Sequence, residues 1–276
     1  MEMLLAILFF VFGVIVGSFL NVVALRYNTG RAPTGRSACF SCGKKLSAAE
    51  LIPVLSYLFL RGRCSKCKST ISIQYPLVEF VTGLLFVFMY WYQSQSLILL
   101  GYYLLVSCLL VVITVYDIRH MIIPDGLVFA FIFLGLARLV YETPLASLVH
   151  TPEIWNLLAG PLLFLPFWAL WYFSKGTWMG FGDAKLAWGI GWTLGLVGGA
   201  SAIILGFWIG AGASLLVMAC SKILAMPSVR KVCTYVHLPT LGFKSAIPFA
   251  PYLIVGMFVA LFTHADLLSL TLILFS

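Results

Sequence analysis

The sequence predicts an all-α polytopic membrane protein in which a small polar module interrupts a series of apolar helices. Its 276 residues are 62% apolar and only 9% charged, whereas charged residues make up roughly 25% of an ordinary soluble domain. A soluble fold of this size could not cover its surface with so few charges. The 22 Phe, 12 Tyr and 8 Trp residues also exclude a solvated, disordered chain.

Eight apolar segments are candidates for transmembrane helices, because about 20 mostly apolar residues cross the hydrocarbon core of a membrane. They are residues 3–25, 76–93, 97–116, 126–141, 154–174, 184–198, 200–220 and 249–275. No cleavage site of the A-x-A type follows the first segment, so we expect a retained helix and not a signal peptide. The chain therefore divides into a first transmembrane helix (1–25), a polar module (26–75) and a transmembrane bundle (76–276).

The basic residues predict how the chain is oriented. Lysine and arginine collect in the cytoplasmic loops of membrane proteins. Sixteen of the 17 here fall on the face that carries residues 26–75, and only Arg138 lies within a span. We therefore expect the polar module in the cytoplasm and both termini on the opposite side. The net charge of +8 points to anionic membrane lipid as a partner of these loops, and not to nucleic acid.

Four cysteines in the polar module have the spacing of a zinc site. They form two pairs, Cys39-Phe-Ser-Cys42 and Cys64-Ser-Lys-Cys67, with 21 residues between them. Two such pairs can close a tetrahedron of thiolates around Zn²⁺, and Gly43 could take the positive φ that such turns need. Four thiolates leave no open position, so the zinc would be structural and would replace a missing core. Two disulfides are the alternative, which a reducing cytoplasm disfavours.

The other three cysteines, Cys108, Cys220 and Cys233, show no metal-binding spacing. Free cysteine commonly behaves as a small apolar residue. We therefore expect these three to be ordinary buried or interfacial residues.

Two aspartates lie at the ends of predicted spans. Asp117 ends the third span, and Asp183 begins the sixth, directly after Gly180-Phe-Gly182. The predicted topology places both at the cytoplasmic boundary on helices that run in opposite directions, so their carboxylates could face each other. Asp117 is the harder to explain structurally, because a carboxylate at a helix C-terminus meets the unfavourable end of the helix dipole and is partly desolvated.

Each of these acids also has a structural explanation. Asp183 precedes a helix and could be its N-cap, a role that is compatible with catalysis. Asp117 could pair with Arg119 or His120. Asp125 stands at the start of the fourth span, and we expect it to be the N-cap of that helix.

Two aspartates and a water molecule suffice for peptide hydrolysis. Two close carboxylates cannot both ionise cheaply, so one of them retains a proton. The ionised carboxylate takes a proton from water, and the protonated one donates to the scissile carbonyl. Gly180 and Gly182 would let the backbone pass close to a substrate strand. Lys185 and Asp125 border these motifs and are further candidates for contact with the substrate.

Short motifs in a fixed order run through nearly the whole chain. They are Gly17-Ser-Phe-Leu-Asn-Val-Val, both cysteine pairs, Ile52-Pro-Val-Leu-Ser-Tyr, Leu60-Arg-Gly-Arg-Cys, Tyr75-Pro-Leu-Val-Glu, Asp117 to Asp125, Gly180-x-Gly-Asp-x-Lys-Leu and Ile247-Pro-Phe-x-Pro. In this combination the sequence resembles the type IV prepilin peptidases, the bifunctional leader peptidases and N-methyltransferases of bacterial pilus, type II secretion and competence systems. The resemblance implies that Asp117 and Asp183 are the catalytic pair of a GxGD-type intramembrane aspartyl peptidase.

The resemblance also implies a substrate, a cofactor and a location. The substrate would be a prepilin or pseudopilin, cleaved after a glycine of its basic leader on the cytoplasmic side of the bacterial inner membrane. The new N-terminal residue would then be methylated with S-adenosylmethionine. The sequence contains no glycine-rich Rossmann fingerprint, so the residues do not indicate where the methyl donor binds.

Two features depart from the family pattern. Phe40 follows the first cysteine, where many members have proline, although the spacing of the cysteines is intact. The 221–247 loop is longer than expected before the motif that follows it, and its Arg230 and Lys231 could contact lipid. Neither departure changes the predicted catalytic pair or zinc ligands.

Three other functions stay open on the residues alone. The protein could be a peptidase only, with a structural zinc loop. A secondary transporter would explain the many glycines and the membrane carboxylates, but it predicts acids near the bilayer midplane and internal repeats. A non-catalytic assembly factor would use both the zinc loop and the aspartates structurally. Single Asp→Asn changes separate these functions, because only an enzyme would lose turnover while staying folded.

Overall fold

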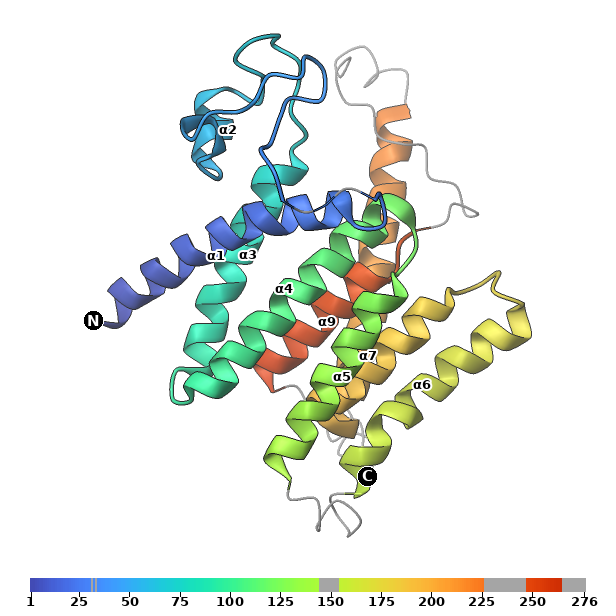
Figure 1. Ribbon diagram of the computed structural model, residues 1–276. Coiled ribbons are helices and arrows are strands. Elements are labelled where there is room, and N and C mark those ends of the chain that lie inside the picture. The colour runs from blue at the N-terminus through green and yellow to red at the C-terminus, as the bar shows by residue number, and fades with distance from the viewer. Residues whose placement is uncertain (31, 33, 144–153, 226–246, 265–276) are drawn as a thin grey trace. The chain divides into compact units, whose positions relative to one another are not determined.

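The computed structural model describes residues 1–30, 32, 34–143, 154–225 and 247–264, and all of its regular elements are helices (Figure 1). The helices are α1 (Glu2–Arg26), η1 (Ala49–Leu51), α2 (Leu55–Phe59), α3 (Gln74–Gln93), α4 (Leu97–His120), α5 (Asp125–Glu142), α6 (Ile154–Ser174), α7 (Phe181–Ala225) and α9 (Ala250–Thr263). These residues form no strand, only two isolated β-bridges in the polar module. Five of the helices are long and apolar enough to cross a membrane, which confirms the predicted all-α membrane class.

The predicted spans coincide with helices, with small shifts at their ends. The shift that concerns the aspartates is in α4, which continues to His120, so Asp117 lies inside its last turn and not at its end. The helix α5 contains the only basic residue that was predicted within a span, Arg138. Its guanidinium Nη2 lies 2.9 Å from Glu142 Oε1, one turn further along the same helix. This ion pair offsets the charge of Arg138 within an otherwise apolar segment.

The sixth and seventh predicted spans are two arms of α7, and the chain reverses between them earlier than predicted. The bounds of the two predicted spans put the turn near Gly198 and Gly199, whereas the non-helical backbone is at Gly195, with φ 75° and ψ −178°. A Cβ on Gly199 would lie 3.2 Å from Gly191 Cα, although eight residues of a straight helix span about 12 Å. Figure 1 shows the gold and orange arms of α7 running in opposite directions. A positive φ suits glycine, which explains the position of the turn.

The chain forms two compact units, and in the first, Met1–Tyr116, close packing joins α1 to α3. A Cβ on Gly13 would lie 2.8 Å from the Thr82 carbonyl oxygen, and one on Gly17 would lie 2.9 Å from Glu79 Cα. Glycines four residues apart on one helix allow this approach of two membrane helices. The Asn21 side-chain amide then bonds to the Tyr75 carbonyl at 3.2 Å, where α3 begins.

In the second unit, Asp117–Ser276, small residues bring other helices against α7. A Cβ on Gly160 of α6 would lie 2.5 Å from the Trp188 ring, and one on Gly206 would lie 3.0 Å from Leu253 Cα of α9. The eighth predicted span, 249–275, is observed as α9, and its remainder lies outside the described residues. The same holds for most of the 221–247 loop, including Arg230, Lys231 and Cys233.

Candidate active site and metal centre

Asp117 and Asp183 come together within the second unit. Asp117 lies in the last turn of α4 and Asp183 in the first turn of α7. Only 5% and 8% of their surfaces are exposed, and the two are close enough for their charges to repel each other. Two buried carboxylates at one place are costly unless one of them binds a proton. The pair therefore suits acid–base chemistry on a water molecule.

The Asp117 carboxylate is only partly satisfied by the protein. The backbone N–H of Ala250, at the start of α9, bonds to it, whereas its Oδ2 has no hydrogen-bond partner among the residues that the structure describes. The helix ends just beyond it, where the Met121 N–H bonds to the Asp117 carbonyl at 2.7 Å. This oxygen can therefore accept a hydrogen bond from a water molecule or a substrate group.

Asp183 is the third residue of α7 and therefore not its N-cap, so this structural alternative does not hold. Its carboxylate instead accepts a hydrogen bond from the backbone N–H of Gly180, just before the helix. This is the reach-back contact of a capping box, in which an acid inside the first turn satisfies the N–H of the capping residue. The contact fixes the carboxylate beside the start of α7.

The two glycines before Asp183 differ in what surrounds them. A Cβ on Gly182 would lie 2.7 Å from Ile123 Cβ, whereas one on Gly180 would lie 3.4 Å from Asp183 Oδ2. We expected both glycines to leave room for a substrate strand. The space beside Gly182 is filled by Ile123, so this glycine allows α7 to pack against the segment that precedes α5.

Asp125 and Lys185 form an ion pair that links the start of α5 to the start of α7. Asp125 is the first residue of α5, and Pro124 occupies the N-cap position without a side-chain cap, so the predicted N-cap role was wrong. The Lys185 ammonium lies 5.1 Å from the ring centre of Phe129 and 4.6 Å from that of Phe181. Cation–π contacts therefore hold this lysine two residues beyond Asp183.

The four cysteines of the polar module form one cluster, with all four sulfur atoms within 4.8 Å of one another. Cys39 Sγ and Cys67 Sγ are 3.8 Å apart, which is the separation expected at the corners of a tetrahedron with Zn–S bonds of about 2.3 Å. All six cysteines in the described residues are free thiols, which argues against the disulfide alternative. The donor set and its spacing therefore fit zinc.

The two cysteine pairs have the same local structure. A β-bridge brackets each pair, Ala38 with Lys45 and Arg63 with Thr70. The residue after each second cysteine has a positive φ, 67° at Gly43 and 60° at Lys68. The positive φ at Gly43 was predicted, whereas the one at Lys68 was not, because lysine rarely adopts this conformation.

The Cys39 and Cys42 thiols differ in pKa and therefore in how readily each would bind a cation as a thiolate. Backbone N–H groups of Cys42 and Ser41 lower the pKa of the Cys39 thiol to about 6. At Cys42 a backbone N–H from Lys44 favours the thiolate, but desolvation and the neighbouring Cys67 and Cys39 sulfurs raise its pKa to about 11. Sulfurs this close cannot all be thiolates without a positive ion between them, which a bound metal would supply.

Glu79 is a buried acid. The sequence pattern did not predict its contacts. It is 7% exposed, and its Oε2 accepts a hydrogen bond from the Val54 backbone N–H at 2.7 Å. The Ser18 hydroxyl bonds to the same carboxylate, and Val54 has the unusual φ of 60° for a β-branched residue. One feature of the sequence could have drawn attention to Glu79: it is an acid within an apolar span, where ionisable residues are rare and usually functional.

Two family descriptions match different parts of the chain. The Bacterial Peptidase A24 N-terminal domain matches residues 11–93, and the Type IV leader peptidase family matches residues 104–227. The first range contains the four clustered cysteines, and the second contains both aspartates. No solved structure matches the chain.

Several curated proteins, each called prepilin leader peptidase/N-methyltransferase, are similar to this chain. The protein from Aeromonas salmonicida is 30% identical over 92% of this chain and 89% of its own. The protein from Bacillus subtilis (strain 168) is 37% identical over 73% of this chain and 79% of its own. That from Pectobacterium carotovorum subsp. carotovorum is 36% identical over 67% and 73%. The chain therefore belongs to the type IV leader peptidase family.

Proposed function

We propose that the protein removes the leader peptide of a type IV prepilin or pseudopilin and then methylates the new N-terminal residue. The observation that carries the proposal is the buried pair Asp117 and Asp183, which lies in the part of the chain that matches the leader peptidases. The names of the relatives support the two activities. Membership of this family favours an enzyme over a transporter or an assembly factor.

The chemistry of cleavage follows from the arrangement of the two acids. One carboxylate, in its ionised form, takes a proton from water as the water attacks the scissile carbonyl, while the other, protonated, donates to the carbonyl oxygen. Oδ2 of Asp117, which has no partner within the described parts of the chain, can hold this water. The backbone N–H groups of Ala250 and Gly180 keep the two carboxylates in place.

Two cofactors complete the proposal. Zinc, held by Cys39, Cys42, Cys64 and Cys67, would have a structural role in the polar module. S-adenosylmethionine would supply the methyl group for the second reaction, as the names of the relatives suggest. The presence of the module favours the bifunctional enzyme over a peptidase that lacks methyl transfer.

The test is incubation of the purified protein, in detergent, with a synthetic prepilin and a methyl-labelled donor. We expect a product shortened by the leader, with the label on its new N-terminal residue. A substrate whose cleavage-site glycine is replaced by a bulky residue is the control and should stay intact. Cleavage without label would show that the protein is a peptidase without methyltransferase activity. An uncut substrate would contradict the proposal.

The orientation can be tested separately. We propose a multi-pass protein of the bacterial inner membrane, with the polar module in the cytoplasm and both termini in the periplasm, because sixteen of 17 basic residues then face the cytoplasm. A reporter that is active only in the periplasm should be active when fused after Gln93 and inactive when fused after Ser47. The reverse pattern would overturn the orientation and with it the reducing environment assumed for the zinc site.

The alanine variants of Gly182 and Gly180 should differ in their effect on cleavage. A Cβ at Gly182 would meet Ile123 Cβ at 2.7 Å, so α7 must shift, whereas at Gly180 the nearest contact is an ordinary 3.4 Å. Misplacing Asp183 by about 1 Å could cost on the order of 10²-fold in rate. We therefore expect a large loss of kcat for Gly182→Ala and a much smaller one for Gly180→Ala. Equal losses would show that packing against Ile123 does not position Asp183.

A further inference from the structure

The two cysteine pairs of the polar module are each closed by their own backbone bonds. The Cys39 N–H donates to the Lys44 carbonyl, and the Cys64 N–H donates to the Ser69 carbonyl, both at 2.9 Å. These bonds shape each pair without joining it to the other, although a tetrahedral site needs two sulfurs from each pair. The Ser69 hydroxyl also lies 3.7 Å from Cys39 Sγ, but sulfur is a weak acceptor. The position of one pair relative to the other therefore depends on further contacts.

The carboxylate of Glu50 connects the two pairs. Glu50 lies in η1, in the stretch of chain between them. Its Oε1 accepts from Lys44 Nζ at 2.6 Å and from the hydroxyl of Ser65, the residue after Cys64. Lys44 Nζ also donates to Ser65 Oγ at 2.6 Å. One carboxylate oxygen thus closes a ring of three bonds with Lys44 beside the first pair and Ser65 inside the second.

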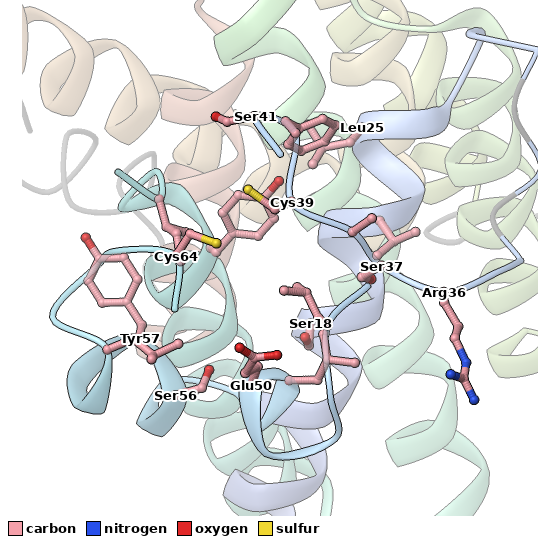
Figure 2. Close-up of a pocket in the computed structure, with 18 of the residues that line it drawn as sticks. Ser18, Leu25, Arg36, Ser37, Cys39, Ser41, Glu50, Ser56, Tyr57 and Cys64 are labelled. Atoms are coloured by element: carbon pink, nitrogen blue, oxygen red, sulfur yellow. The ribbon is translucent and has the colours of Figure 1, made fainter. Parts of the chain in front are cut away.

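Glu50 is anchored by the protein and does not belong to the metal-binding cluster itself. Its Oε2 accepts from the backbone N–H of Ser47 at 2.9 Å and from the hydroxyl of the same residue at 3.1 Å. Only 11% of its side chain is exposed. Figure 2 shows Cys39 and Cys64 close to each other, with Glu50 apart from both. Because both of its oxygens are occupied, any effect of this acid on the metal site passes through the residues that it holds.

Lys44 is held where its charge acts on both pairs. Glu50 is the only acid among residues 26–75, which carry nine lysines and arginines. Its ionic partner Lys44 lies close enough to Cys42 and Cys64, one cysteine from each pair, for their charges to act on the ammonium. Four thiolates around one divalent ion have a net negative charge. An ammonium fixed at this place offsets that charge and is shared by the two pairs.

We propose that Glu50 is a positioning residue of the metal centre, which holds Lys44 and Ser65 so that both cysteine pairs present their sulfurs to one ion. The inference rests on the proposed zinc site and adds a residue outside its four ligands. Groups that orient metal ligands from outside commonly change metal affinity about 10–100-fold when they are lost. Glu50 therefore contributes to zinc affinity without binding the zinc.

The direction of the change in affinity separates a role in positioning from an effect of charge. Zinc binding releases protons from the thiols, so negative charge builds up at the site. A nearby carboxylate opposes this build-up by its charge alone. Loss of the Glu50 charge alone would therefore strengthen zinc binding, whereas loss of the contacts that position Lys44 and Ser65 weakens it.

The test measures transfer of zinc from the purified full-length protein, in detergent under reducing conditions, to increasing amounts of a chromogenic chelator. Glu50→Gln replaces one accepting oxygen by an amide group that cannot accept, and we expect zinc affinity to fall about tenfold or more. Lys44→Met should lower it by a similar factor. The double variant should bind zinc no more weakly than the weaker single variant, because the two residues act as one unit.

Two further measurements make the test specific. Lys45→Met is the matched control, because it removes the same charge from the neighbouring lysine, which is exposed, and it should leave zinc affinity unchanged. Saturating Co²⁺ in place of zinc should give Glu50→Gln the same thiolate-to-metal absorption as the wild type, because all four ligands remain.

The outcomes separate this inference from the zinc site on which it rests. Weaker zinc binding by Glu50→Gln and Lys44→Met, with Lys45→Met unchanged and all variants monodisperse in gel filtration, supports the inference. Zinc held by Glu50→Gln as tightly as by the wild type, or more tightly, overturns it and leaves the four-cysteine site intact. Additive losses in the double variant also overturn it, because Lys44 would then act without Glu50.

Two results would contradict the inference in other ways. Loss of the cobalt absorption in Glu50→Gln would show that Glu50 is needed for the fold of the module and not for the position of its sulfurs. A wild-type protein that carries no zinc would contradict both the inference and the metal site.

Discussion

Replacing either Asp117 or Asp183 by asparagine is expected to abolish cleavage of a prepilin. Each acid has a separate proton-transfer role, so neither can take over the work of the other. A positioned acid or base contributes roughly 10²–10⁴-fold to a rate, and losing one member of a cooperating unit typically costs about as much as losing the whole unit. We therefore expect each single variant to be as inactive as the double variant, at least about 10²-fold below the wild type.

Both variants should stay folded, because asparagine preserves the contacts that the structure shows. Its side-chain oxygen can still accept from the backbone N–H of Ala250 at position 117 and of Gly180 at position 183. The amide has nearly the same size as the carboxyl group, and it removes the repulsion between two buried acids. Loss of turnover in a stable protein would separate a catalytic role from a structural one.

The matched control is Asp125→Asn, which makes the same change in an acid whose side chain is 68% exposed and paired with Lys185. We expect a much smaller loss, because an exposed ion pair contributes only about 0–1 kcal/mol. The measurement is cleavage by the three single variants, with gel filtration in detergent as the folding check. If Asp125→Asn were inactive and Asp117→Asn active, the catalytic pair would have to be Asp125 and Asp183.

Methyl transfer gives a second control on the same variants. A substrate that has already lost its leader should be methylated normally by Asp117→Asn and Asp183→Asn, because methyl transfer needs no pair of carboxylates. Loss of both activities together would instead indicate damage to the fold.

The parts of the structure that depend on local sequence could be predicted. The length of the apolar segments predicted where the helices lie, because an apolar segment of about 20 residues has few alternatives to a membrane helix. Cysteine spacing identified the four clustered sulfurs, because two residues between cysteines let both reach one ion. Local rules were less reliable at helix ends: α4 continues past Asp117, and α7 reverses at Gly195, slightly before the Gly198-Gly199 pair near which the turn was predicted.

Contacts between distant residues could not be predicted from these patterns. The partner of Asp125 is Lys185, 60 residues away, and that of Glu79 is the backbone of Val54, 25 residues away. Neither pair follows a helical or strand period. An N-cap was therefore predicted at Asp125, where the side chain is in fact used for a tertiary ion pair. Such contacts depend on how the helices pack, which the order of residues along one helix does not specify.

Replacing Cys64 by serine is expected to remove the zinc and disorder the polar module. Cys64 is the most buried of the four ligands, with 4% exposed. A structural zinc site contributes an apparent ~10–16 kcal/mol of binding free energy to folding, more than the core of so short a module can supply. The second unit, Asp117–Ser276, has its own helix packing and should remain folded.

Elemental analysis should find one zinc per chain in the wild type and none in Cys64→Ser, while limited proteolysis should cut the variant within residues 26–75. Cys108→Ser is the control, because Cys108 lies in α4 outside the cluster, and it should keep its zinc. A wild-type protein without metal, with these cysteines in disulfides, would contradict the site. Because the presence of this module favours the methyltransferase function, methylation should fall further than cleavage, which depends on acids in the other unit.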